Sequence, residues 1–332
     1  MIARRPFNRI ALATLVALTG CLPKDRIPSP QRTSTPPLRV PVSHPDPPTS
    51  PAGTAPTFGG CQLFPADNAF NTRIDGLAVR SDSATVIART TSLGANHMQF
   101  DVYSDPAYGM YPISVPQSQA LVPITYDQYG SDSDPGPFPI PLDAPQEGGG
   151  DKHILVVQQG TCQLYELWAS HRSTSGWYAG SGAKWDLTKN SSRPAGWTSA
   201  DAAGLPILPG LLRYDEVAGG TINHSLRFTV ENTRQAYIAP ASHAAGVADT
   251  ALFPMGARLR LKASYDISRF SGQSKVIATA LKTYGLIVAD NGQNWMISGQ
   301  SDARWNDHDM DQVRAIPASA LEYVDTGPVI SA

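Results

Sequence analysis

The sequence predicts a mainly β protein whose folded part is one sandwich or jelly-roll-like domain with two or three short helices. Runs rich in β-branched and aromatic residues recur along residues 59–332, separated by Gly, Pro, Asn and Asp about every ten residues. Few segments show the apolar spacing of a helix, and no internal repeat is present. A β-rich α+β fold, with a helix and strand over residues 273–290 packed on a sheet, is the alternative.

The first part of the domain predicts one helix followed by strands. Residues 81–91 suit a short helix, and residues 98–103, 111–115 and 121–126 have the composition of strands. Residues 132–145 contain too many prolines for a central strand, so this segment must follow a surface.

A hairpin is expected next. Residues 153–158 form a nearly continuous apolar strand, residues 159–161 make the turn, and residues 162–170 return with side chains that alternate between two faces. Residues 177–187 indicate another pair of strands.

Two strands are expected at residues 225–230 and 235–238, joined by a turn. In residues 258–263 Arg and Leu alternate, which predicts a half-exposed strand with its Leu face inward.

The C-terminal part predicts a helix over residues 273–283, which Gly285 would end, and then a buried strand at residues 286–289. Asp290-Asn291-Gly292 has the composition of a hairpin turn, leading into residues 295–298. A short helix at residues 309–314 and a strand at residues 321–324 complete the domain.

The N-terminus has the pattern of an export signal over residues 1–20: three arginines and then an apolar run, residues 10–18, that is too short to span a bilayer. Leu18-Thr19-Gly20-Cys21 resembles the lipobox of bacterial lipoproteins. The resemblance implies that Cys21 becomes the lipidated first residue and that the protein is held on a membrane of the bacterial cell envelope. An ordinary cleaved signal and a retained signal anchor are the alternatives, and both leave Cys21 without a role.

Residues 21–58 are dominated by Pro, Ser and Thr. Such a segment cannot bury enough apolar surface to offset its ordering entropy, so we expect an extended tether between the lipid and the domain. Export also exposes the chain to oxidising surroundings, which predicts a disulfide between Cys61 and Cys162. Two buried free thiols are the alternative.

The charge balance disfavours nucleic acid as a partner. The chain has 26 basic and 28 acidic residues; without the three arginines of the signal, the mature chain has a net charge of about −5 and no long basic run. No sequence motif for a nucleotide, a metal or another cofactor is present. We expect a monomer that contacts the membrane through its lipid.

Several motifs follow one another in a fixed order: Glu147-Gly-Gly-Gly-Asp-x-His153, Cys-x-Leu-Tyr-Glu-Leu, Ala-Gly-Leu-Pro-Ile-x-Pro-Gly-Leu-x-Arg-Tyr-Asp-Glu-Val and Ile-x-His-x-Leu-Arg-Phe. This order resembles a set of secreted or lipid-anchored bacterial proteins of unassigned function. The resemblance covers nearly all of residues 61–325. It implies export and one folded unit, and no activity.

Two segments gather the candidate catalytic residues. Asp151 and His153 stand at the entry to the expected hairpin, while Asp215, Glu216, His224 and Arg227 lie within a Gly-rich stretch. We expect the two segments to build one polar cleft. Trp177, Trp185, Trp197, Trp295 and Trp305 could form a platform for sugar rings, with core packing as the alternative.

Each candidate also has a structural interpretation. Asp215 and Glu216 are neighbours, so we do not expect them to form a carboxyl pair across a sugar bond with each other. One of them could instead pair with a carboxylate of another segment: Glu147, Asp151, Glu166 or Asp290. Asp215 also suits the start of a helical turn. His224 lies between Ile222 and Leu226, where a hydrogen-bonded core histidine is an alternative to a general acid or base. Arg227 would face the other side of such a strand unless a bulge intervenes.

The sequence therefore predicts a lipid-anchored envelope protein whose β domain acts on or binds extracellular carbohydrate, as a polysaccharide hydrolase or lyase. A non-catalytic binding or structural lipoprotein is the alternative.

Overall fold

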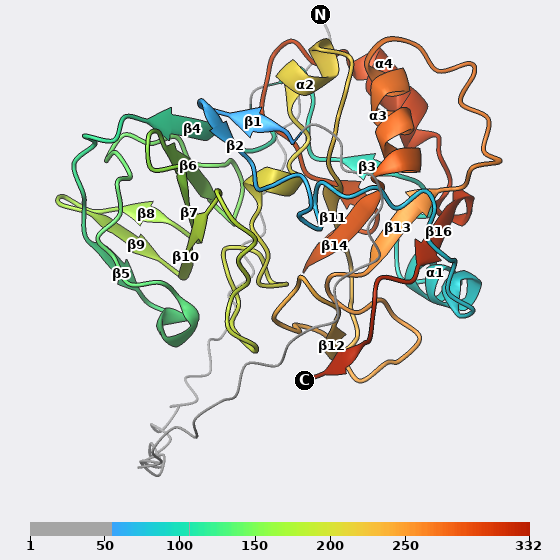
Figure 1. The fold of residues 1–332 in the computed structure, drawn as a ribbon, viewed down its shortest axis with the longest axis horizontal. Helices are drawn as coiled ribbons and strands as arrows, with labels where there is room; N and C mark the ends of the chain where they lie inside the picture. The colour runs from blue at the N-terminus through green and yellow to red at the C-terminus, as the bar shows by residue number, and fades with distance from the viewer. Residues whose placement is uncertain (1–54, 106) are drawn as a thin grey trace, which may run out of the picture. The chain divides into compact units, whose positions relative to one another are not determined.

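The computed structural model describes residues 55–105 and 107–332, and these residues belong to one compact unit. The unit is built from several small sheets and a few helices (Figure 1), so the prediction of a mainly β domain is confirmed. The predicted signal, residues 1–20, the lipidation site Cys21 and the tether up to residue 54 lie outside the described residues. None of the described helices is long and apolar enough to cross a bilayer.

A four-stranded sheet occupies one half of the unit. Its order is β10 (Ser181–Asp186), β7 (Gln163–Trp168), β6 (Ile154–Gln158) and β4 (Pro112–Val115). The predicted hairpin is confirmed, because β6 and β7 pair antiparallel. The first four residues of β6 are apolar because both faces of the strand are covered: Leu155 and Val157 belong to one core, and Ile154 and Val156 to another.

The second of these cores separates the four-stranded sheet from a three-stranded one. The latter has the order β5 (Ile124–Tyr126), β9 (Trp177–Ala179) and β8 (His171–Arg172). Strands β9 and β10 therefore belong to different sheets, and the prediction that residues 177–187 form a strand pair is wrong. The chain changes sheet at Gly180, where an added Cβ would lie 2.5 Å from the ring of Trp168.

A six-stranded sheet with the largest core forms the other half. Its order is β16 (Leu321–Val324), β13 (Arg258–Leu261), β14 (Leu286–Asn291), β11 (Leu226–Val230), β15 (Met296–Ile297) and β3 (Gln99–Phe100). Strands β11 and β14 are parallel. The predicted hairpin through Asp290-Asn291-Gly292 is wrong, because β11 lies between β14 and β15 and pairs with both. The turn composition is local, whereas the choice of strand partner is tertiary.

Four α-helices occur in the described residues. They are α1 (Ser83–Thr91), α2 (Tyr214–Ala218), α3 (Gly272–Thr283) and α4 (Asp307–Arg314). Helices α3 and α4 contact each other and pack against β13 and β3, and α1 packs against β16 (Figure 1). The helices expected over residues 81–91, 273–283 and 309–314 are therefore confirmed, and α2 adds one further turn.

The remaining elements are short. They are two strand pairs, β1 (Thr57–Phe58) with β2 (Cys61–Gln62) and β12 (Ala236–Tyr237) with β17 (Ile330–Ser331), and the 3₁₀ turns η1 (Gly130–Asp132), η2 (Leu208–Gly210) and η3 (Ala318–Ala320). The predicted disulfide is confirmed: Cys61 and Cys162 are bonded, with their Cα atoms 5.4 Å apart. It ties β2 to the start of β7.

Strand β13 corrects one prediction. All four of its residues are buried, so the strand is not half-exposed. Arg258 donates hydrogen bonds to the carbonyls of Ala69 and Tyr284, at 2.6 and 3.0 Å, and Arg260 pairs with Glu322 at 2.7 Å. An alternating pattern predicts an exposed polar face, but buried carbonyl oxygens can satisfy arginines equally well.

Candidate functional site

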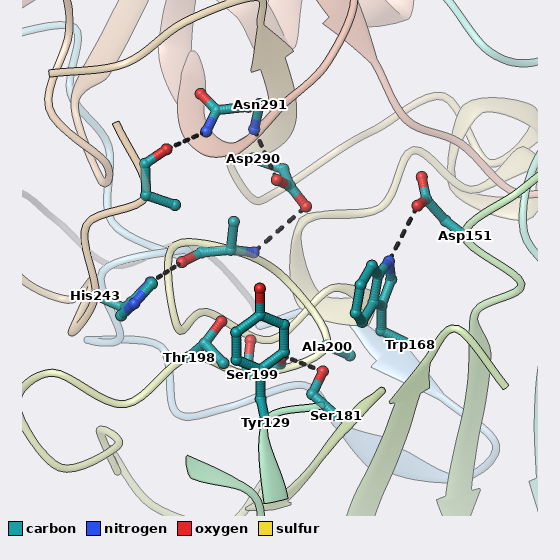
Figure 2. A pocket seen from close by; sticks show the side chains of 12 residues that line it. Tyr129, Asp151, Trp168, Ser181, Thr198, Ser199, Ala200, His243, Asp290 and Asn291 are labelled. Carbon is teal, nitrogen blue, oxygen red and sulfur yellow. Dashed lines mark hydrogen bonds between the residues drawn. The ribbon is translucent and has the colours of Figure 1, made fainter. Parts of the chain in front are cut away.

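A cavity of about 270 Å³ opens where elements of the two halves meet. The six-stranded sheet contributes Asp290 and Asn291 from the end of β14, and the four-stranded sheet contributes Trp168 from the end of β7 and Ser181 from the start of β10. The remaining lining residues come from loops: Tyr129, Asp151, Thr198, Ser199, Ala200, Ala202, His243 and Ala245. Figure 2 shows the carboxyl of Asp290 pointing into the space that Tyr129, Trp168 and His243 surround.

Two aromatic side chains form part of the wall. The ring centroids of Tyr129 and Trp168 lie 6.0 Å apart at an interplanar angle of 47°. Tyr129 is exposed, whereas Trp168 is half-buried and its indole N–H donates to Oδ1 of Asp151 at 3.0 Å (Figure 2). The hydrogen bond fixes the ring beside an exposed carboxylate. Flat apolar faces next to polar groups are suited to sugar rings.

Asp290 is a half-buried carboxyl with two backbone donors. Its Oδ1 accepts from the amide of Asn291 at 2.7 Å, and its Oδ2 accepts from the amide of Ala202 at 3.3 Å. Burial, and then the charge of the neighbouring Asp201, raise the pKa of Asp290 to about 8. A side-chain hydrogen bond also joins the two carboxyls. The pair therefore retains one proton at neutral pH, as two close carboxyls must.

Behind Asp290, Asp201 and Arg227 form a fully buried ion pair. The guanidinium donates from Nε to Oδ2 at 3.0 Å and from Nη2 to Oδ1 at 2.7 Å, and its Nη1 donates to the hydroxyl of Ser298. Burial alone would lower the pKa of Arg227, but the charge of Asp201 outweighs burial and the pKa is raised. Arg227 thus holds Asp201 through two of its nitrogens, and its donors are used within the protein.

His153 is also buried and lies in the same layer behind the cavity as Asp201 and Arg227. Burial alone would lower its pKa, but the hydrogen bond and charge of Glu147 raise it above the usual histidine value. Its Nε2 donates to the carbonyl of Ala200 at 3.1 Å, so the histidine anchors the segment that forms one wall of the cavity.

Two further carboxyls interact electrostatically with the Asp201–Arg227 pair. Burial raises the pKa of Asp101 to about 7, although the amide of Gly299 donates to it at 2.8 Å. Burial likewise raises the pKa of Glu166 to about 7, against hydrogen bonds from the amides of Ile207 and Leu208. Of the three carboxyls with raised pKa values, only Asp290 lines the cavity, and a perturbed carboxyl in a cavity is typical of functional sites.

The structure separates the residues that the sequence grouped. Of the six predicted catalytic residues, Asp151 lines the cavity, while His153 and Arg227 lie in the buried layer behind it. The two segments therefore do not line this cavity jointly, because Asp151 is the only residue of either segment in its lining.

The other three predicted residues lie at α2. Glu216 bonds the guanidinium of Arg213 and Nε2 of His224, the latter at 3.0 Å. Burial would raise the pKa of Glu216, but Arg213 and His224 lower it. His224 is completely buried, whereas Asp215 is exposed in the first turn of α2 and pairs with Arg304 at 3.0 Å. These contacts fit the structural interpretations of His224 and Asp215.

Sequence reasoning missed the residues that define the cavity. Asp290 was assigned to a turn and considered only as one of four possible partner carboxylates, and Asp201, Tyr129 and Trp168 were not singled out as site residues. A carboxylate within a run of small apolar residues, Ser199-Ala-Asp-Ala-Ala-Gly204, was the signal available for Asp201. Of the tryptophans proposed as a platform, Trp177, Trp185, Trp295 and Trp305 are core residues.

Within residues 55–105 and 107–332, no three His, Cys, Asp or Glu side chains are placed to hold one metal ion. Comparison with protein-family models, with curated proteins and with solved structures found no significant match.

Proposed function

We propose that the cavity binds a segment of an extracellular glycan and hydrolyses a glycosidic bond. The observation that supports this best is a carboxyl, Asp290, that is protonated at neutral pH and faces a cavity flanked by Trp168 and Tyr129. A general acid of this kind is what glycosidic cleavage requires, because the leaving oxygen must receive a proton.

The roles follow from the positions of the side chains. Trp168 and Tyr129 stack against sugar rings, and Asp290 donates the proton of the Asp201–Asp290 pair to the leaving oxygen as the bond to the anomeric carbon breaks. Water supplies the new hydroxyl, and its second proton passes to an ionised carboxylate on another wall. Asp151 is our candidate for that carboxylate, acting either directly as a base on water or through a covalent intermediate.

Hydrolysis is favoured over elimination. A lyase that acts on an acidic sugar needs a cation for the sugar carboxylate, and Arg227 is the only cation among the six predicted catalytic residues that could provide it if a bulge brought it into the cleft. Arg227 is buried and bonded to Asp201 and Ser298, and among the described residues no Lys or Arg lines the cavity.

The test is to incubate the full chain with a panel of polysaccharides and to measure hydrolysis by the release of reducing ends. Asp290→Asn removes the proton donor at nearly constant shape and should lower kcat by about 10²–10⁴-fold with little change in substrate affinity. Trp168→Ala should weaken binding by up to about tenfold. Asp143→Asn is the control, since Asp143 is an exposed loop carboxylate outside the cavity lining. Equal activity of Asp290→Asn and the parent would refute this role of Asp290.

A glycan-binding role without catalysis is the second candidate. It is favoured by the polar groups of the wall that already bond within the protein, such as Asp151 to Trp168 and Asn291 to the carbonyl of Ala245. Calorimetric binding that persists in Asp290→Asn, with no product released by the parent, would identify this role.

We further propose that the domain is held at the bacterial cell envelope through a lipid on Cys21. The lipobox resemblance supports this, and the Cys61–Cys162 disulfide fits an oxidising compartment. When the full chain is expressed in a bacterium that lipidates exported proteins, it should fractionate with membranes and incorporate labelled fatty acid. Cys21→Ala should abolish both, whereas the tether variant Ser34→Ala should not. A labelled Cys21→Ala chain would contradict the assignment.

A further inference from the structure

The charges around the cavity indicate which kind of sugar it accepts. Two carboxyls, Asp151 and Asp290, reach the cavity from different halves of the unit, and no Lys or Arg among the described residues lines it. Asp151 is exposed and lies against the indole of Trp168, whose face is tilted toward the phenol ring of Tyr129. The wall thus combines one carboxylate with two aromatic faces.

Among the remaining polar groups His243 presents an acceptor, whereas the hydroxyls of Ser181, Thr198 and Ser199 donate within the protein. His243 donates from Nδ1 to the carbonyl of Ala202 at 2.7 Å, so in the neutral ring Nε2 is the acceptor. Asn291 uses its amide group on the carbonyl of Ala245 and its oxygen on Thr233. A ligand rich in donors, and above all a cationic donor, complements such a wall.

We propose that the bound glycan contains hexosamine units with free amines, whose ammonium group sits beside Asp151 against the faces of Trp168 and Tyr129. Aromatic faces attract cations, and a carboxylate in a partly enclosed wall pairs best with an ammonium group. An N-acetylated sugar would leave the charge of Asp151 without a counterion, and a uronic acid would be repelled by it. This inference rests on the proposed function and names its substrate class.

A binding measurement tests the substrate class separately from hydrolysis. A turnover measurement would not, because Asp151 is also the candidate base for the reaction. We would use the full-chain Asp290→Asn variant, which binds without cleaving, and measure calorimetric affinity for four hexamers: glucosamine, N-acetylglucosamine, cellohexaose and oligogalacturonate. The glucosamine hexamer should bind at least about tenfold more tightly than cellohexaose at low salt, and added salt should reduce the difference because it screens a partly exposed pair.

Adding Asp151→Asn to this background should remove the preference for glucosamine while leaving the affinity for cellohexaose nearly unchanged. Adding Asp143→Asn should preserve the preference, and thermal unfolding will show that both variants fold. Tight binding of cellohexaose or the N-acetylated hexamer without a preference for glucosamine would overturn the substrate class and leave the proposed function standing. Failure of every hexamer to bind, together with no hydrolysis of the polysaccharide panel, would overturn both.

Discussion

At the scale of single residues, the Asp201–Arg227 pair determines what Asp290 can do. Arg227 is bonded in a bidentate manner to Asp201, both side chains are buried, and Asp290 shares a hydrogen bond with the same carboxylate. The charge of Asp201 helps to raise the pKa of Asp290, so this pKa depends on a residue that does not line the cavity. Arg227 is thus a positioning residue.

Removing the cation should be costly. We expect Arg227→Met to lower the free energy of unfolding by about 3–5 kcal/mol, because it leaves Asp201 buried without a counterion. The double variant Asp201→Asn/Arg227→Met should lose clearly less, and the exposed Arg172→Met should change stability by less than about 0.5 kcal/mol. Urea unfolding of the full chain measures all three. If Arg227→Met is at least as stable as Asp201→Asn/Arg227→Met, the two side chains are not coupled in this way.

At the scale of elements, the approach of β14 to the cavity depends on the turn that connects it to α3. Gly285 has φ = +66°, and an added Cβ would lie 2.0 Å from the carbonyl oxygen of Leu259 in the neighbouring strand β13. Only glycine combines that backbone conformation with that close approach. The turn therefore sets the start of β14, and five residues later the chain reaches Asp290.

Gly285→Ala tests this dependence. The left-handed conformation costs an alanine about 1–2 kcal/mol, and the contact with Leu259 adds to it, so we expect a loss of more than about 2 kcal/mol in denaturant unfolding. Gly76→Ala is the matched control, because no atom lies within 4 Å of its added Cβ and its φ is not in the left-handed range. Equal stability of the two variants would contradict the argument.

At the scale of the whole molecule, titratable groups with raised pKa values occur in both halves. Asp290 and Asp101 belong to the half with the six-stranded sheet, Glu166 belongs to β7, and His153 links the entry of β6 to the 198–202 segment. All of them bind protons more tightly in the folded state than in the unfolded chain. The folded protein therefore holds more protons than the unfolded chain, by an amount that varies with pH.

Stability should fall as pH rises from about 4 to about 8. Carboxyls with folded pKa values of about 7 to 8, against an unfolded value of 3.8 to 4.5, hold extra protons over this range, so the slope of stability with pH is negative. The raised pKa of His153 acts in the same direction, because its contribution is lost as pH rises through the folded value.

Below about pH 4.5 the slope reverses, because the lowered pKa of Glu216 makes its contribution disappear as that carboxyl is protonated. Thermal unfolding across pH 3–9 should therefore peak near pH 4–5. Asp290→Asn, which resembles the protonated carboxyl, should flatten part of the descent, and Asp143→Asn should not. A melting temperature that rises steadily to pH 8 would contradict the prediction that the folded protein holds extra protons over this range.

The sequence alone determined the features that depend on local chemistry. Strand composition indicated the mainly β class, apolar spacing indicated α3, the continuous apolar run indicated the β6–β7 hairpin, and two cysteines in a chain predicted to be exported indicated the disulfide. Each of these features follows from the periodicity of apolar residues, from the composition of a turn or from the predicted compartment, and all three can be inferred from the sequence.

Tertiary structure alone decided strand partners and side-chain environments. Strand β15 pairs with β11, although the turn composition at Asp290 predicted a hairpin with β14. Arg258 and Arg260 can be buried because backbone carbonyls and Glu322 accept their hydrogen bonds. Asp151 meets Asp290 at one cavity, while Asp215 remains on the surface. The physical reason is that burial and neighbouring charges come from segments distant in sequence, and these set the pKa of a carboxyl and its access to a ligand.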